Sequence, residues 1–416
     1  IHIILIGNFE LFNIFPMLID INNINSLINA LFLVLLVNYI KKQNYINNKN
    51  LFLLLILSSP ILISVILTQK PFFIPLITQV LFCEVNFRKK FDNNKETIIS
   101  FIALFASMGI KLNFIISGGL IMVIYFIYYY KNILNFEFFN KIFLSFLFIL
   151  LPIFIFRYVA YSDPLAPFLN FLPNEIYNKN ILINFSESLK NWNKNEFFFP
   201  VNLFLSNKII NMNNTLGLGL IIILFQRNII HNNKIFLVSI ILFLSNIIFV
   251  QQTARFFLLP FLLLLFSLNF DKIKFLKFFK ILFTVNLFVL LSIVSIFYLP
   301  AVIKITFLND EKIKEKIIFR YKTFKTLESI IGTDKVVIVD NPNYYSKNTD
   351  IGRMIIQYAN NEEDLIEYKK FLNQQNPEFL LVTENSIQNK KFFNLYNNEI
   401  NNFFIKCFED EISRFS

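Results

Sequence analysis

Long apolar segments, repeated along the first 300 residues, constrain this chain more than any other feature of its sequence. Most of them approach the roughly 20 residues that a helix needs to cross the hydrocarbon core of a membrane. One run, 202–226, is interrupted by SNKIINMNN, so its crossing part is expected to be TLGLGLIIILFQ. The pattern predicts an all-α polytopic membrane bundle of about ten spans over residues 1–300. The runs cover residues 24–40, 51–67, 70–87, 97–111, 113–130, 141–159, 202–226, 234–250, 254–269 and 277–300.

Composition supports this class. Hydrophobic residues make up 55% of the 416-residue chain and charged residues only 16%, a balance far from that of a soluble domain. The net charge of +11 comes mainly from the turns between spans, so it points to membrane orientation and not to nucleic acid. Cys83 lies in a predicted span and Cys407 near the C-terminus, while His2 and His231 fall on opposite faces. No disulfide framework and no His/Cys metal site is expected.

Turns rich in Lys and Arg alternate with poorer ones along the predicted spans. Cytoplasmic loops carry the positive excess in membrane proteins, so the rich turns are expected in the cytoplasm. This places residues 1–23, the loop 157–200 and everything after 300 on the external face of the membrane. In a bacterium, the membrane is expected to be the inner (plasma) membrane. The rich turns lie at residues 41–49, 88–95, 131–141, 227–234 and 272–280.

Two stretches fall outside the apolar pattern. The loop 157–200 is the longest polar interval between spans; it is either a plain connector or a functional insert, since long irregular loops are often functional. Residues 301–416 have the composition of a soluble domain. There KVVIVD and EFLLVT are predicted strands on either side of a predicted helix, EEDLIEYKKFLNQQ, with FFIKCFE as a further candidate strand. This predicts a small, external parallel α/β domain over 301–416, without a Gly-rich phosphate loop.

Cations at the ends of spans on the external face are the first candidates for a binding site. Each one could simply extend its charged group to the membrane interface. Together they would form a cationic cup suited to a phosphate head group. Asp163 is followed by a proline that holds its backbone extended, and it is either a turn residue or a carboxylate placed above the head groups. The four cations are Lys70, Lys111, Arg157 and Arg255.

Short motifs spread over nearly the whole chain carry a family resemblance. They are GNFELFNIFPMLI, SSPILISVILTQKPFFIPLITQVLF, ASMGIKLNFII, RYVAYSDPLAPFLNF and ARFFLLP, followed in the tail by VVIVDNPNYY and PEFLLV. In these motifs the chain resembles the GT-C class of integral-membrane glycosyltransferases, the group that uses polyprenyl-phosphate sugars and includes aminoarabinose-transferase-like and mannosyltransferase-like proteins. The chain departs from the pattern in Ser-Asp-Pro at 162–164, where the family has Gly-Asn-Pro, and in Phe72, where some relatives carry a polar residue.

The resemblance implies a mechanism. A sugar carried on polyprenyl phosphate is transferred to a lipid, glycan or protein acceptor on the external face. A carboxylate takes the proton of the acceptor hydroxyl, and cations stabilise the departing phosphate. In this chain the resemblance makes Glu10 and Asp163 the candidate carboxylates, and Lys70, Lys111, Arg157 and Arg255 the donor-phosphate ligands. The family's defining acid would precede Ile1, so the chain is expected to be truncated at its N-terminus. Glu10 could equally be an interfacial or helix-start residue.

Other functions stay open at this point. A lipid-linked sugar flippase or transporter would fit the spans, although no internal repeat of the spans is evident. An envelope-polysaccharide polymerase also uses a large external loop. A purely structural membrane protein would explain neither the loop nor the tail. The sequence leaves the sugar, the acceptor and any cofactor undetermined, a divalent cation included.

Overall fold

The computed structural model of the chain divides into two compact units. The first comprises residues 1–172 and 189–291, and the second comprises 173–188 and 292–416. The structure describes residues 24–46, 48–67, 72–88, 94–110, 113–129, 136–161, 199–205, 215–217, 219, 230–249, 253–270, 275–293, 295–296, 300, 337–339, 349–351, 366 and 379–381.

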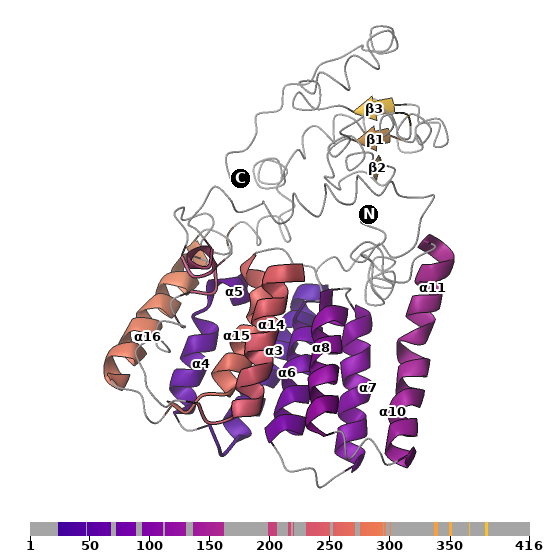
Figure 1. Cartoon of the computed structure of the whole chain (residues 1–416). Helices are drawn as coiled ribbons and strands as arrows, with labels where there is room; N and C mark the ends of the chain where they lie inside the picture. Colours follow the sequence, from indigo (N-terminus) through magenta and orange to yellow (C-terminus); the bar gives the residue numbers. More distant parts are fainter. Residues whose placement is uncertain are drawn as a thin grey trace. The chain divides into compact units, whose positions relative to one another are not determined.

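The first unit is a helical bundle, and Figure 1 shows its helices standing side by side. Most of them lie inside the predicted apolar runs, which confirms the mostly helical class. The helices are α3 (Ile24–Lys42), α4 (Lys49–Leu57), α5 (Pro60–Leu67), α6 (Phe73–Cys83), α7 (Asn94–Ile110), α8 (Asn113–Tyr128), α10 (Phe136–Ile149), α11 (Leu151–Tyr161), α14 (Asn233–Phe249), α15 (Ala254–Phe266) and α16 (Leu276–Ile293). Two short turns join them, the π-helical η2 (Glu84–Arg88) and the 3₁₀-helical η3 (Val201–Leu203).

Helix α6 is the centre of the bundle. It packs against α3, α7, α8 and α15, and Phe73, Leu76 and Val80 along it are fully buried. A helix that is apolar on every side is one that other helices surround. Aromatic rings fill the space around it, with Phe82 and Phe101 in an edge-to-face contact at 5.0 Å between ring centroids.

Helices at the margin of the bundle expose apolar side chains. On α10, Phe136 is 81% exposed and Phe148 is 78% exposed, and α3 and α16 show similar faces. Extended apolar faces of this kind mark contact with a membrane or with another protein. In the part of the chain that the structure describes, one helix is long and apolar enough to cross a membrane, Phe136–Phe156, and the bent pair of α4 with α5 would be a second. The count of ten spans stays a prediction.

The run 51–67, predicted as one span, is broken. Helices α4 and α5 meet at a bend of 68°. The reason is Pro60, which has no amide hydrogen and disfavours a helical conformation in the residue before it. Backbone groups freed by the break find partners elsewhere in the bundle: the amide of Ile61 donates to Thr215 O at 3.0 Å, and Asn286 Nδ2 donates to Ser58 O at 3.0 Å.

The segment Thr215–Gly217 lies against this break and is not helical, although the sequence predicted a helix there. Its backbone carbonyls accept hydrogen bonds at the break: besides the amide of Ile61, the hydroxyl Ser59 Oγ donates to this segment, to Leu216 O at 2.8 Å. Gly217 has a φ of +79°, and a Cβ at this position would lie 2.9 Å from Pro60 Cδ. The close approach therefore requires glycine.

In the second unit, three short strands form a parallel sheet. They are β1 (Val337–Val339), β2 (Thr349–Ile351) and β3 (Phe379–Leu381), in the order β2-β1-β3. Strands β1 and β3 fall in the two predicted strand segments, and their parallel pairing fits a strand–helix–strand connection. Strand β2 was not predicted, because its sequence has no alternating apolar pattern. The predicted helix and the third candidate strand lie outside the described residues except for Ile366, so the α/β domain as a whole stays a prediction.

Candidate functional site

Of the six residues that the sequence singled out, the structure describes the side chain of one. Glu10, Lys70, Lys111 and Asp163 lie outside the described residues, as does most of the loop 157–200. Arg157 belongs to helix α11, and its side chain is outside the description as well. The cationic cup and the two carboxylates therefore stay predictions, and Arg255 is the residue from which a site can be built.

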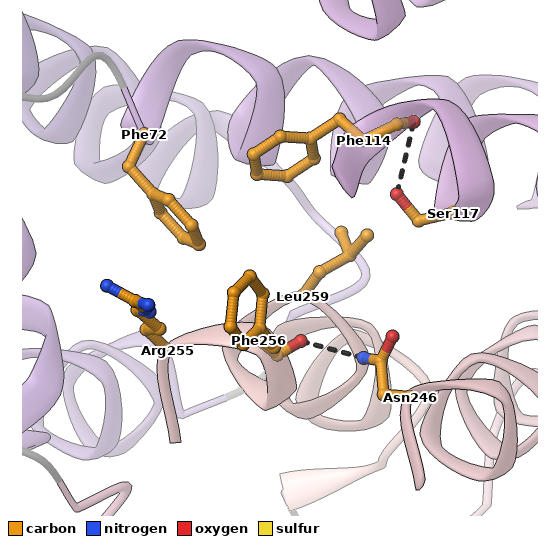
Figure 2. A pocket seen from close by; sticks show the side chains of 7 residues that line it. All are labelled: Phe72, Phe114, Ser117, Asn246, Arg255, Phe256 and Leu259. Atoms are coloured by element: carbon orange, nitrogen blue, oxygen red, sulfur yellow. Dashed lines mark hydrogen bonds between the residues drawn. The ribbon is translucent and has the colours of Figure 1, made fainter. Parts of the chain in front are cut away.

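Arg255 stands in the first turn of α15, at the edge of a small cavity (Figure 2). The cavity volume is about 20 Å³, which is room for roughly one water-sized group. The side chain of Arg255 is exposed, and its guanidinium carbon lies 4.8 Å from the ring centroid of the neighbouring Phe256. The lining residues are Phe72, Phe114, Ser117, Asn246, Arg255, Phe256 and Leu259.

Three helices begin at this cavity. Phe72 immediately precedes α6, Phe114 lies in the first turn of α8, and Arg255 lies in the first turn of α15. The first turn of a helix presents unbonded amide hydrogens and the positive end of the helix dipole. In α6 one of these amides is already satisfied, because Phe73 N–H donates to the buried Asn29 Oδ1 at 3.3 Å. Among the residues that the structure describes, the lining side chains include one cation and no carboxylate, a balance that favours an anion at this end of the bundle.

One wall of the cavity is aromatic and the other is polar. On the aromatic wall, the rings of Phe72 and Phe114 meet edge to face at 5.1 Å. On the polar wall, Asn246 Nδ2 donates to Phe256 O at 2.7 Å, and Ser117 Oγ donates to Gln79 Oε1 at 2.7 Å. The cavity beside Arg255 thus has an apolar surface on one side and polar side chains on the other.

The opposite end of α15 is built differently. Arg88, in η2, donates from Nε and Nη2 to the two carboxylate oxygens of Glu84, each at 3.0 Å. The Glu84 side chain is fully buried. Arg88 also donates to Phe266 O at the end of α15, and its guanidinium carbon lies 3.8 Å from the ring centroid of Tyr45. We call this group of Tyr45, Glu84, Arg88 and the Phe266 carbonyl the Arg88 clamp.

Tyr45 closes the clamp from the turn between α3 and α4. Its hydroxyl donates to Glu84 Oε2. Burial, together with the negative charge of Glu84, raises the pKa of Tyr45 well above its usual range, so the phenol keeps its proton. Every charged group of the clamp therefore has a partner, as a buried ion pair requires.

Further hydrogen bonds fix the segment that follows α15. Asn48 Nδ2 donates to Phe270 O at 3.2 Å, and the amide of His231 donates to Ser267 O at 2.8 Å. Asn232 Nδ2, next to His231, reaches Phe87 O at 3.4 Å. The C-terminal end of α15 is thereby joined to three other connecting segments. These contacts set the position of the helix whose first turn carries Arg255.

The comparisons with known proteins give one match. The model of the DUF1420 N-terminal domain matches residues 2–309. The chain belongs to the DUF1420 family. No curated protein and no solved structure matches it.

The DUF1420 match includes both the cavity and the Arg88 clamp, whereas the three strands lie beyond its end at residue 309. DUF1420 is a family of unknown function, so the match is consistent with a GT-C-like enzyme without assigning an activity. Among the residues that the structure describes, no group of three or more His, Cys, Asp or Glu could hold a metal ion. The cofactor therefore stays undetermined, as it was from the sequence.

At these two places in the DUF1420 chain, sequence reasoning missed Ser117, Asn246, Glu84 and Tyr45. Ser117 and Asn246 are single polar residues inside apolar runs, a pattern that ordinary helix–helix packing also produces. Glu84 was treated as part of a span. Its spacing of four residues from Arg88 is the signal that could have revealed the clamp, because residues i and i+4 meet on one helix face and an acid inside an apolar run needs a partner.

Proposed function

We propose that this DUF1420 protein is an integral-membrane glycosyltransferase, a hexosyl- or pentosyltransferase that uses a polyprenyl-phosphate sugar. Its acceptor is a lipid, a glycan or a protein on the external face of a bacterial inner membrane. The observation that carries the proposal is the position of Arg255, beside a cavity at which three helices begin. The resemblance of ARFFLLP and the other motifs to GT-C enzymes supplies the reaction class.

In this proposal the phosphate of the donor binds at the guanidinium of Arg255. Arginine suits this role because it stays charged and presents several donors in one plane. The first turn of α15 adds amide hydrogens and the positive end of its dipole. The prenyl chain stays in the hydrocarbon of the membrane, where burial of apolar surface favours it.

The chemistry follows from this placement. The bond between the anomeric carbon and the phosphate oxygen breaks, and the acceptor oxygen forms the new bond to that carbon. Negative charge grows on the departing phosphate, where Arg255 stabilises it. The acceptor proton goes to a carboxylate, for which Glu10 and Asp163 remain the candidates in this chain. Lys70 and Lys111 precede α6 and α8 by three and two residues in the sequence, and they are proposed to complete the phosphate site together with Arg157.

The membrane setting rests on the apolar faces of α3, α10 and α16 and on the span Phe136–Phe156. In this setting the proposal puts the cavity and residues 301–416 on the external face. Turns rich in Lys and Arg are expected in the cytoplasm, and the turn 41–49 carries Tyr45 of the Arg88 clamp, at the other end of α15.

One structural feature favours a second candidate, a flippase for lipid-linked sugars. Transporters often place broken helices at their substrate sites, and α4 with α5 forms such a break. The two functions differ in their products. A transferase releases polyprenyl phosphate and glycosylates an acceptor, whereas a flippase moves the intact lipid from one leaflet to the other.

The test uses full-length protein in vesicles that contain a polyprenyl phosphate. Arg255→Gln should raise the Kd for this lipid by about 10- to 100-fold, since hydrogen bonds to charged groups contribute roughly 1.5–3 kcal/mol. Lys277→Gln is the matched control, because Lys277 is an exposed cation on α16 that does not line the cavity; it should leave the Kd unchanged. Equal affinity of the Arg255 variant and the parent would remove the proposed phosphate site. A second measurement separates the two candidates. Transfer of labelled sugar to a membrane acceptor supports the transferase, and movement of the intact lipid between leaflets supports the flippase.

A further inference from the structure

Asn246 places a polar carboxamide in the apolar interior of the bundle. It lies in the last turn of α14, in an apolar stretch, and only 7% of its surface is exposed. A buried amide destabilises a helical bundle unless its donor and its acceptor are both bonded. Its position at the cavity in Figure 2 therefore calls for an explanation beyond packing.

The contacts of Asn246 fix which of its atoms faces the cavity. The carbonyl of Phe256 can only accept a hydrogen bond, so the atom at 2.7 Å from it must be the amide nitrogen. The carboxamide oxygen is then turned to the cavity side, as Figure 2 shows. None of the described residues donates a hydrogen bond to this oxygen. Asn246 thus presents an unused acceptor.

Ser117 also presents an acceptor to the cavity, because its hydroxyl hydrogen is used in other hydrogen bonds. Gln79 Nε2 donates to Phe114 O at 3.0 Å, which sets the orientation of the Gln79 amide and directs its oxygen to Ser117. The only hydrogen of the Ser117 hydroxyl is used by two acceptors, Gln79 Oε1 at 2.7 Å and Phe114 O at 3.3 Å, the second of which Figure 2 draws. What the hydroxyl has left for the cavity is its lone pairs.

The two acceptors restrict what can enter. A cavity of about 20 Å³ holds one hydroxyl or amino group and is too small for a phosphate. Such a group must donate a hydrogen bond, since an acceptor would be repelled by Asn246 and Ser117. The cation beside the cavity, Arg255, favours an anionic group on the ligand. A ligand that carries a hydrogen-bond donor close to an anionic group meets all of these conditions.

We propose that the cavity receives one hydroxyl or amino group of the sugar on the lipid donor, and that Asn246 and Ser117 thereby select the sugar. This inference rests on the proposed function, in which Arg255 holds the phosphate of the same ligand. The selection is a difference in binding between a lipid that carries the sugar and one that does not. It is therefore separable from the binding of the phosphate itself.

The experiment measures two affinities for each full-length protein in vesicles. One probe is a polyprenyl phosphate, and the other is the same lipid carrying glucose, mannose, arabinose or aminoarabinose. The parent should bind at least one sugar-bearing lipid more tightly, by about threefold to tenfold for one hydrogen bond. Asn246→Leu should bring this ratio close to one and leave the affinity for the bare lipid unchanged, and Ser117→Ala should reduce the ratio. Ser107→Ala is the matched control, because Ser107 accepts from Gln79 but does not line the cavity.

Arg255→Gln makes the two proposals distinguishable. It should weaken the binding of both lipids by the same factor and leave their ratio as in the parent. A parental ratio in Asn246→Leu overturns the role of Asn246 while the phosphate site stands. If the parent binds neither lipid, or Arg255→Gln changes neither affinity, the proposed function falls and the selection of the sugar falls with it. Deoxy-sugar lipids give the same answer without any variant: if the parent prefers a sugar and no single deoxy analogue loses that preference, the inference is wrong.

Discussion

The two ends of helix α15 use their polar groups in opposite ways. At the Phe266 end, Arg88 is bonded to both oxygens of Glu84 and to the Phe266 carbonyl, and Tyr45 covers its guanidinium face. At the other end, Arg255 is exposed and an acceptor of Asn246 faces the cavity.

The difference separates stability from binding. Groups that are fully paired inside the bundle stabilise it and have nothing left for a ligand. Groups at a binding site must keep donors or acceptors available, which is why such sites belong to the less stable parts of a fold. A guanidinium alone does not indicate function; its position and surroundings do.

The largest expected effect is all-or-none, and it concerns the side of the membrane on which each end lies. Single cysteines are placed at Arg255 and at Lys41, an exposed residue at the end of α3 and four residues before Tyr45. The background carries Cys407→Ser and retains the buried Cys83. An impermeant thiol reagent should label position 255 in intact cells and position 41 only after permeabilisation. Labelling of both positions from outside would show that the two ends do not face opposite compartments.

The next largest effect is on stability, where the same substitution should act differently at the two ends. Arg88→Gln leaves the buried Glu84 carboxylate without its cation and should lower the free energy of unfolding by about 3–5 kcal/mol. Arg255→Gln should change it by less than about 0.5 kcal/mol, as exposed positions do. Denaturant unfolding in detergent micelles measures both. Replacing Glu84 and Arg88 together by leucine should recover part of the loss; a double variant as unstable as Arg88→Gln would contradict this account of the clamp.

Two neighbouring glycines on α8 test how tightly the cavity end is packed. A Cβ at Gly118 would lie 2.4 Å from Met108 Cγ and 3.1 Å from Gln79 Nε2. Gly118→Ala should therefore cost about 1–3 kcal/mol, the usual range for overpacking, and should disturb the Gln79–Ser117 hydrogen bond. The same unfolding measurement applies, with sugar selection as a second readout. A fully stable Gly118→Ala protein would mean that Met108 moves aside without cost.

The smallest effect is expected at the adjacent residue. A Cβ at Gly119 meets no atom within 4 Å. Gly119→Ala should then stabilise the protein by about 0.5–1 kcal/mol, because alanine loses less backbone entropy than glycine in a helix. Melting temperatures of the two variants, measured side by side, should move in opposite directions. A shift in the same direction would show that local space on α8 does not decide the outcome.

The sequence predicted the helical class because its apolar runs are long and regularly spaced. It identified Arg255 because a cation at the end of a span is visible without a structure. It could not reveal the clamp or the cavity wall, since these depend on which helices meet: Glu84 contacts Tyr45, 39 residues away, and Ser117 contacts Gln79, 38 residues away.

The break between α4 and α5 shows the same limit more locally. The stretch Ser58-Ser59-Pro60 was interpreted as part of a family motif within a span, although a proline after two serines also permits a helix to end and another to begin there. The bend is maintained by Thr215, Leu216 and Asn286, far along the chain, and no local pattern carries that information.

That break also bears on how the protein is made. The carbonyl of Ser58 accepts a hydrogen bond from Asn286, which is synthesised 228 residues later. At a translation rate of about 5–20 residues per second, roughly 10–45 s pass between the synthesis of the two. Neither α4 nor α5 is long enough to be inserted as a span by itself, with 9 and 8 residues. We therefore expect the bend between α4 and α5 to reach its final hydrogen bonding only after α16 has been synthesised.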